Sequence, residues 1–120
     1  MIITGIDLVE VARLEEAIER HGARFLDRIF TEQEQATCDG NCQRLAGRWA
    51  IKEAVAKALG TGVGDMKWVE IEVSNNERGK PILNLHGDAQ RMSDEQQIPN
   101  WSISLSHTET HATGIAIGYA

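Results

Sequence analysis

The sequence is poor in residue types that mark special environments. Its 120 residues include two prolines, two cysteines, one tyrosine and two phenylalanines. No apolar run approaches the roughly 20 residues that a membrane-spanning helix needs. The N-terminus lacks a basic segment followed by a long apolar stretch, so we expect no signal peptide. These absences predict a cytoplasmic protein that has no membrane partner.

Cysteine is too scarce for a structural zinc site. Cys38 and Cys42 cannot complete four ligands alone, and no histidine lies close to them in the sequence. Their spacing would allow a disulfide within one loop. We interpret them instead as free thiols, because disulfides are rare in a reducing compartment.

Positive charge is also scarce. Twelve lysines and arginines stand against 18 aspartates and glutamates, which gives a net charge of −6. This balance argues against a general nucleic-acid-binding protein. A hydrophobic content of 42% and a charged content of 25% are typical of a soluble globular protein. The length suits one domain, and no linker or repeat divides it, so we expect a single domain over residues 1–120.

The order of the predicted elements favours an α+β fold. Helices are expected at residues 9–21, 23–30, 43–59 and 87–97, and a capping box begins the helix that follows Thr31. Strands are expected at residues 2–6, 68–74, 81–85, 101–106 and 113–119. The strands at 68–74 and 81–85 are joined by a turn and should pair as a hairpin. This order predicts a mainly antiparallel sheet packed on a long central helix.

One carboxylate is unusual in the long helix. Glu53 lies in an alanine-rich apolar segment, where a charge is costly. Trp49, Glu53 and Lys57 are spaced by four residues and share one stripe of the helix. The simple interpretation is a surface ion pair between Glu53 and Lys57, worth about 0.3–0.5 kcal/mol. A second, basic stripe is expected beside it, formed by Arg44, Arg48 and Lys52.

A second isolated acid, Asp7, follows the first apolar strand. Aspartate is a favoured N-cap, so Asp7 would also suit the start of the next helix. The alternative is a metal site, because Mg²⁺ takes oxygen ligands and usually binds one or two carboxylates together with water and substrate phosphate. Asp7 and Glu53 would supply that pair if the fold brings them together.

Residues 60–64 form a glycine-rich loop, but they do not form a Walker loop, because no Gly-Lys-Ser/Thr sequence closes them. They also follow a helix C-terminus, the wrong end of the dipole for an anion. The glycines therefore fit a helix cap and a turn at least as well as a phosphate cradle, and Lys57 is the better phosphate ligand. His107 lies at a strand end, where a surface histidine is the simpler interpretation.

The first helix carries a separate pattern. If the helix continues through Gly22, Arg13, Arg20 and Arg24 fall within roughly 40° of one another at ~100° per residue, and Arg28 lies close by. An apolar face lies beside these arginines. The pattern fits either a solvated amphipathic helix or a docking surface for an acidic partner helix.

Several segments together resemble one family. The segment GIDLVEVAR at residues 5–13 resembles the N-terminal motif of the holo-acyl-carrier-protein synthases, the small 4′-phosphopantetheinyl transferases. The segment LAGRWAIKEA at residues 45–54, continued by Lys57 and the glycines at 60–62, looks like the family signature. Matching blocks are FLDRIFT at 25–31 with Glu34, GKP at 79–81 and SLSHT at 104–108.

The resemblance implies an α+β fold and a homotrimer with an active site at each subunit interface. It implies transfer of phosphopantetheine from coenzyme A to a serine of apo-acyl carrier protein, with release of adenosine 3′,5′-bisphosphate. Asp7 and Glu53 would hold Mg²⁺ against the pyrophosphate, and Glu53, directly or through a metal-bound water, is the favoured acceptor of the serine proton.

The resemblance also implies two sets of binding residues. Lys57 would contact the pyrophosphate, and His107 is the favoured contact to the 3′-phosphate. The implied coenzyme A contacts are Arg48, Lys57, Gly60, Gly62, Lys80, Pro81, Ser106 and His107. The residues implied to face the acidic helix of the carrier protein are Arg13, Arg20, Arg24 and Arg28.

Two other functions remain as alternatives. A non-enzymatic adaptor would bind acidic helices through the arginines and would need neither Asp7 nor Glu53. A different Mg²⁺-dependent nucleotide-binding transferase or hydrolase would act without a carrier protein. The carrier itself could serve fatty acid, polyketide or peptide synthesis.

Overall fold

The computed structural model describes residues 1–61 and 64–120 and confirms the predicted α+β class. The helices are α1 (Val11–His21), α2 (Ala23–Ile29), α3 (Glu32–Cys38), α4 (Cys42–Leu59) and α5 (Gly87–Glu95), with a 3₁₀ turn, η1 (Trp68–Glu70). The strands are β1 (Ile2–Glu10), β2 (Ile71–Asn75), β3 (Pro81–Leu85), β4 (Asn100–His107) and β5 (His111–Tyr119).

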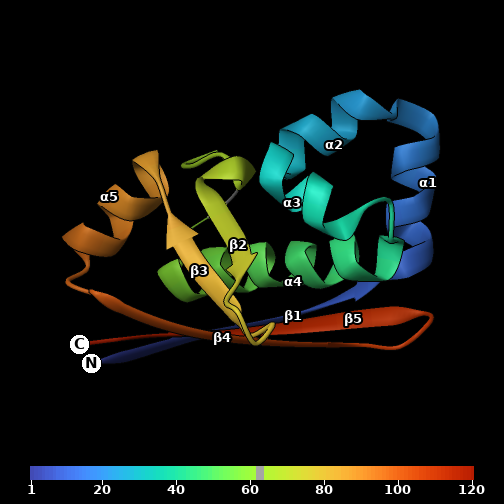
Figure 1. Ribbon diagram of the computed structural model, residues 1–120. Coiled ribbons are helices and arrows are strands. Elements are labelled where there is room, and N and C mark those ends of the chain that lie inside the picture. Colours follow the sequence, from blue (N-terminus) through green and yellow to red (C-terminus); the bar gives the residue numbers. More distant parts are fainter. Residues whose placement is uncertain (62–63) are drawn as a thin grey trace.

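Helix α4 lies at the centre of the molecule (Figure 1). Strands β1, β5 and β4 form an antiparallel sheet in that order, and α4 lies across one face of it. The β2–β3 hairpin is a separate antiparallel sheet on another side of the same helix. The predicted single sheet is therefore divided in two, because a helix buried on every side needs cover from more than one layer.

Small residues let α4 approach the sheet closely. A Cβ atom added to Gly5 on β1 would overlap the carbonyl oxygen of Ala54, and one added to Gly114 on β5 would lie 2.7 Å from the backbone nitrogen of Ile51. Ala50 and Ala54 are fully buried at this contact. The close approach brings the side chains that flank these positions on β1 and α4 into one region.

The start of the chain differs from the sequence-based prediction. The strand predicted at residues 2–6 continues to Glu10, because it pairs with β5 along its whole length. Helix α1 therefore begins at Val11, and Glu10 is its N-cap residue. The helix-cap role considered for Asp7 is wrong, since Asp7 lies within the strand. The strand predicted at 68–74 begins at Ile71, after the 3₁₀ turn.

A buried ion pair joins α3 to α4. Glu34 and Lys52 are 1% and 0% exposed, and 2.8 Å separates Glu34 Oε1 from Lys52 Nζ. Lys52 Nζ also donates to the carbonyl oxygens of Trp68 and Ile71, so all three of its N–H bonds have acceptors. Burial lowers the pKa of Lys52, and the Glu34 carboxylate partly opposes that effect.

The same pair corrects the sequence analysis. Lys52 was predicted to lie on a basic surface stripe with Arg44 and Arg48, but Lys52 and Arg48 are both buried. The predicted capping box is confirmed: Thr31 Oγ1 accepts from Glu34 N, and Thr31 N donates to Glu34 Oε1. The Glu34 carboxylate thus caps one helix and binds a lysine of another.

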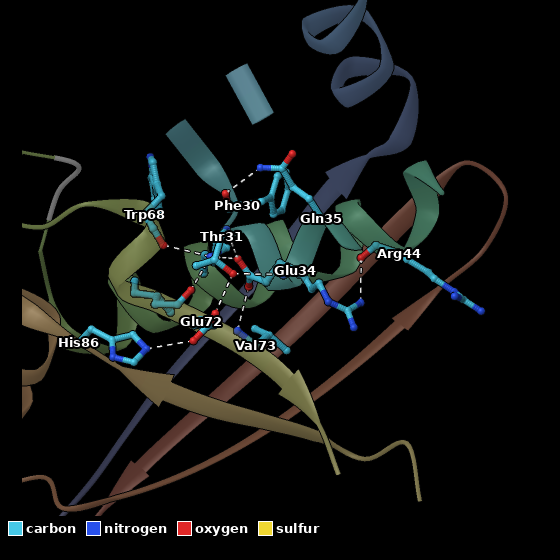
Figure 2. Close-up of polar contacts among 12 residues, drawn as sticks. Phe30, Thr31, Glu34, Gln35, Arg44, Trp68, Glu72, Val73 and His86 are labelled. Carbon is cyan, nitrogen blue, oxygen red and sulfur yellow. Dashed lines mark hydrogen bonds and ion pairs between the residues drawn. The ribbon is translucent and has the colours of Figure 1, made fainter. Parts of the chain in front are cut away.

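The network continues outward to the surface (Figure 2). Val73 N donates to Glu34 Oε2 at 2.8 Å, and Thr31 Oγ1 donates to Glu72 Oε2 at 2.7 Å. His86 Nε2 lies 3.0 Å from Glu72 Oε1. Burial alone would raise the pKa of Glu72, but hydrogen bonds from Thr31 and His86 outweigh it and hold that pKa below its ordinary value. The hairpin is thereby fixed to α3.

We expect the Lys52→Met substitution to lower the free energy of unfolding by about 3–5 kcal/mol, because it leaves the Glu34 carboxylate buried without its cation. Urea denaturation measures this loss. Lys67→Met removes an exposed lysine and should stay within about 0.5 kcal/mol of the wild type. In the double variant with Glu34→Leu, the loss should be smaller than the sum of the two single losses. A loss below about 1 kcal/mol for Lys52→Met would contradict the structural role of the pair.

Candidate active site

The fold brings Asp7 and Glu53 together. Asp7 lies on the face of β1 that is turned toward α4, in the same alternation as buried Gly5 and Val9. Glu53 lies on α4, and both acids line one cavity of about 350 Å³. The remaining lining residues come from β1, α1, α2 and α4, and are Leu8, Val9, Glu10, Arg13, Leu14, Ala17, Phe25 and Trp49.

The cavity disfavours a second negative charge. Burial raises the pKa of Glu53, and repulsion by Asp7 raises it further, while the Lys57 ammonium lowers it. Two aromatic side chains form part of the wall: the rings of Phe25 and Trp49 lie 6.3 Å apart, and Trp68 packs behind Trp49 with 4.9 Å between their rings. A bound cation would relieve the repulsion between the two carboxylates.

Lys57 pairs with Asp7 in the described part of the chain, and the predicted surface pair with Glu53 is not formed. Lys57 Nζ lies 2.7 Å from Asp7 Oδ1 and donates to the carbonyl oxygen of Ile6 at 3.1 Å. The hydrogen bond to Asp7 raises the pKa of Lys57. Lys57 is predominantly exposed, and it lines a neighbouring cavity with Gly5 and Ile6 and does not line the cavity of the two acids.

The two carboxylates suit Mg²⁺ better than they suit a metal whose ligands all come from protein side chains. Within residues 1–61 and 64–120, no three or more histidine, cysteine or acidic side chains form a metal cluster. Mg²⁺ needs only one or two carboxylates when water and phosphate oxygens complete its shell. Asp7 and Glu53 are such a pair, because both line one cavity and the charge of Asp7 adds to burial in raising the pKa of Glu53.

Arg48, Lys80 and Pro81 lie elsewhere in the same chain. Arg48 Nη2 donates to Asn75 Oδ1 at 2.6 Å, and Asn75 pairs with Pro81 across the β2–β3 hairpin. None of the three lines the cavity that holds the two acids. Arg48 Nε is buried and has no hydrogen-bond partner among the described residues.

Ser106 and His107 lie at the end of β4, both exposed. His107 pairs with Ala112, and Ala112 pairs with Val9 on the other side, so β5 separates His107 from β1. Gly60 has φ 72° and forms the left-handed cap that ends α4, which confirms the cap interpretation. Gly62 lies outside the described residues.

The four arginines are exposed, but they do not share one helix. Gly22 ends α1 with φ 56°, so Arg13 and Arg20 lie on α1, whereas Arg24 and Arg28 lie on α2. The projection through Gly22 was therefore wrong. Among the described residues, no acidic side chain forms an ion pair with any of the four, and Arg13 reaches the cavity of the two acids.

Some site residues were missed by the sequence analysis. Asn75 holds Arg48 from another element, and no local pattern indicates that contact. Phe25 and Trp49 form the cavity wall. The shared helical stripe of Trp49 and Glu53 was a usable signal for the tryptophan, because residues four apart on a helix lie side by side.

An α+β fold with two carboxylates in one cavity, and a lysine bound to one of them, defines a protein suited to metal-assisted phosphate chemistry. The model of the 4′-phosphopantetheinyl transferase superfamily matches residues 3–116. The chain therefore belongs to this family. It is 46% identical, over 125 aligned positions, to the holo-[acyl-carrier-protein] synthase of Herpetosiphon aurantiacus, and the alignment covers 98% of each chain.

Solved structures agree with this assignment. The structure of the Helicobacter pylori holo-[acyl-carrier-protein] synthase in complex with coenzyme A superposes on this chain with a TM-score of 0.89 and 30% sequence identity. The match covers 98% of this chain and 100% of that chain. The Bacillus anthracis holo-(acyl-carrier-protein) synthase in complex with CoA (3′,5′-ADP) has a TM-score of 0.78 and 33% identity, and covers 97% and 94%.

Proposed function

We propose that the protein is a holo-[acyl-carrier-protein] synthase that transfers 4′-phosphopantetheine from coenzyme A to a serine of apo-acyl carrier protein. The observation that carries the proposal is the pairing of Asp7 with Glu53 beside Lys57, in a chain of the 4′-phosphopantetheinyl transferase superfamily. The similarity to the Herpetosiphon aurantiacus synthase and to coenzyme A complexes supports the substrates.

In the proposed reaction, the serine oxygen forms a bond to the phosphorus that carries pantetheine, and adenosine 3′,5′-bisphosphate leaves as the P–O bond breaks. Asp7 and Glu53 would hold Mg²⁺, which would supply charge neutralisation at the pyrophosphate. Glu53 accepts the serine proton.

Coenzyme A would contact two groups of side chains. Lys57 would bind the pyrophosphate, and His107 and Ser106 would contact the 3′-phosphate end. Gly60 and Gly62 are further proposed contacts, of which Gly62 lies outside the described residues. Arg48, Lys80 and Pro81 form the other group, at the hairpin. Because this group does not line the cavity of the two acids, a second subunit that places its hairpin near the first cavity would complete the site.

The outer face of the β1–β5–β4 sheet supports the proposed homotrimer. Ile2, Ile6 and Leu8 on β1 are 71%, 62% and 67% exposed, and Ile115 and Tyr119 on β5 lie opposite them. Exposed apolar patches of this kind mark interaction sites. A second copy of this chain is the proposed occupant, because it would cover the apolar face and also bring the missing binding residues to each site.

The partner surface is formed by Arg13, Arg20, Arg24 and Arg28, which present positive charge on an otherwise acidic protein. Such a surface steers an acidic carrier toward the cavity, and Arg13 connects the two. Reaction in the cytoplasm is consistent with the free thiols of Cys38 and Cys42. No helix in the described part of the chain is long and apolar enough to span a bilayer.

The first test is the reaction itself. The protein is incubated with coenzyme A, Mg²⁺ and apo-acyl carrier protein, and the carrier is weighed by intact mass spectrometry. A phosphopantetheine mass gain is expected for the wild type, with a loss of at least about 100-fold in rate for Asp7→Ala and Glu53→Ala. A chelator should abolish the gain. No gain with several carriers, from a folded protein that still binds one of them, would favour the adaptor.

Charge reversal tests the partner surface. Arg20→Glu and Arg24→Glu should each raise the KM for apo-acyl carrier protein by about tenfold and leave kcat nearly unchanged, since neither residue lines the cavity. Steady-state kinetics at two salt concentrations measure the effect, which should shrink at high salt. Arg91→Glu, on the exposed surface of α5, is the matched control. An equal KM for all three variants would contradict the assignment.

Sedimentation equilibrium tests the assembly. The wild type should sediment with three times the 13.3 kDa mass of one chain. Ile6→Asp places a charge on the outer sheet face and should give monomers with little transferase activity, whereas Ala36→Asp on the exposed side of α3 should leave the trimer intact. A fully active wild-type monomer would rule out a shared site.

A further inference from the structure

Lys57 forms an ion pair with Asp7, one of the two acids proposed to bind the metal. Its ammonium lies 2.7 Å from Asp7 Oδ1 and also donates to the Ile6 carbonyl oxygen, so it is held against β1 by two acceptors. Asp7 is 16% exposed, whereas Lys57 is 56% exposed. Asp7 is held on β1 within the sheet. The more exposed Lys57 side chain is therefore the partner that can move.

A divalent cation at Asp7 would compete with this ammonium. Asp7, Glu53 and Lys57 together carry a net charge of −1, and the ammonium lowers the negative potential that would attract the metal. The ion pair is substantially exposed, and exposed pairs are weak. An incoming polyanion would therefore be able to draw Lys57 away from Asp7.

We propose that Lys57 takes the place of the metal on Asp7 in the free protein and releases Asp7 when the pyrophosphate of coenzyme A offers it a new partner. Lys57 is then the residue that couples metal binding to coenzyme A binding. The inference rests on the proposed magnesium site. It adds that the protein binds the metal weakly without coenzyme A and more tightly when coenzyme A is bound.

The coupling has a physical consequence in both directions. If coenzyme A raises the affinity for the metal, the metal raises the affinity for coenzyme A by the same factor. Lys57 is also a ligand for the pyrophosphate in the proposed function, so activity alone would not separate its two roles. Metal affinity without coenzyme A isolates the competition at Asp7.

The test uses Mn²⁺ as the probe, because the electron paramagnetic resonance signal of unbound Mn²⁺ can be counted during a titration of the full-length protein. Lys57→Gln should bind Mn²⁺ about tenfold more tightly than the wild type without coenzyme A, since a repelling charge is removed. The factor by which coenzyme A tightens Mn²⁺ binding should fall by a similar amount. Unchanged melting temperatures establish that each variant is folded.

Two controls isolate the ion pair. Lys57→Arg keeps the positive charge and should resemble the wild type. Lys67→Gln removes an equal charge from an exposed residue that lines neither the cavity of the two acids nor the one that Lys57 lines, and should also leave Mn²⁺ affinity unchanged. Equal or weaker Mn²⁺ binding by Lys57→Gln, compared with the wild type, would overturn the inference.

Asp7→Asn and Glu53→Gln distinguish this failure from that of the metal site itself. If wild-type protein with coenzyme A binds Mn²⁺ and both variants lose it, the carboxylate pair stands, and the result for Lys57→Gln decides the inference alone. If Mn²⁺ binding survives both substitutions, the carboxylates are not the ligands, and the inference fails together with the proposed magnesium site.

Discussion

The ion pair between Glu34 and Lys52 determines how the parts of this molecule meet. A lysine ammonium can be buried only when its charge and its N–H bonds are satisfied, and here the partners come from α3, η1 and β2. The pair therefore fixes the rotation of α4 about its axis. Glu53 follows Lys52 in the sequence and points about 100° away. With Lys52 held inward toward the hairpin, Glu53 is directed to the cavity beside β1.

Patterns that depend on neighbouring residues were readable from the sequence. The capping box of Thr31 and Glu34, the cap at Gly60 and the extent of α4 each arise within a few residues, and all are confirmed. The stripe of Trp49, Glu53 and Lys57 follows from helical geometry alone. The location of Asp7 was wrong in detail, because the length of β1 is set by pairing with β5 at the other end of the chain.

Patterns of neighbouring residues could not predict which charged side chains are buried, or that the predicted binding residues lie in separate places. Lys52 and Arg48 looked like surface residues, since their partners Glu34 and Asn75 lie on other elements. A helical projection through Gly22 assumed a single axis, and the backbone there turns out of the helix. Some of the predicted binding residues fall outside the cavity of the two acids. If the site forms between subunits, as proposed, one chain contains only part of it, and neither its sequence nor its fold shows the whole site.

The pairing of β1 with β5 also bears on how the protein is made. Asp7 lies opposite Gly114, so the acid enters its strand ladder only after β5 has been synthesised. Until then β1 is an unpaired edge with exposed Ile2, Ile6 and Leu8, and such edges bind other chains. The nascent protein therefore depends on late, long-range closure, which is slow compared with helix formation. Any interruption of translation before β5 leaves a chain without its sheet and without a placed Asp7.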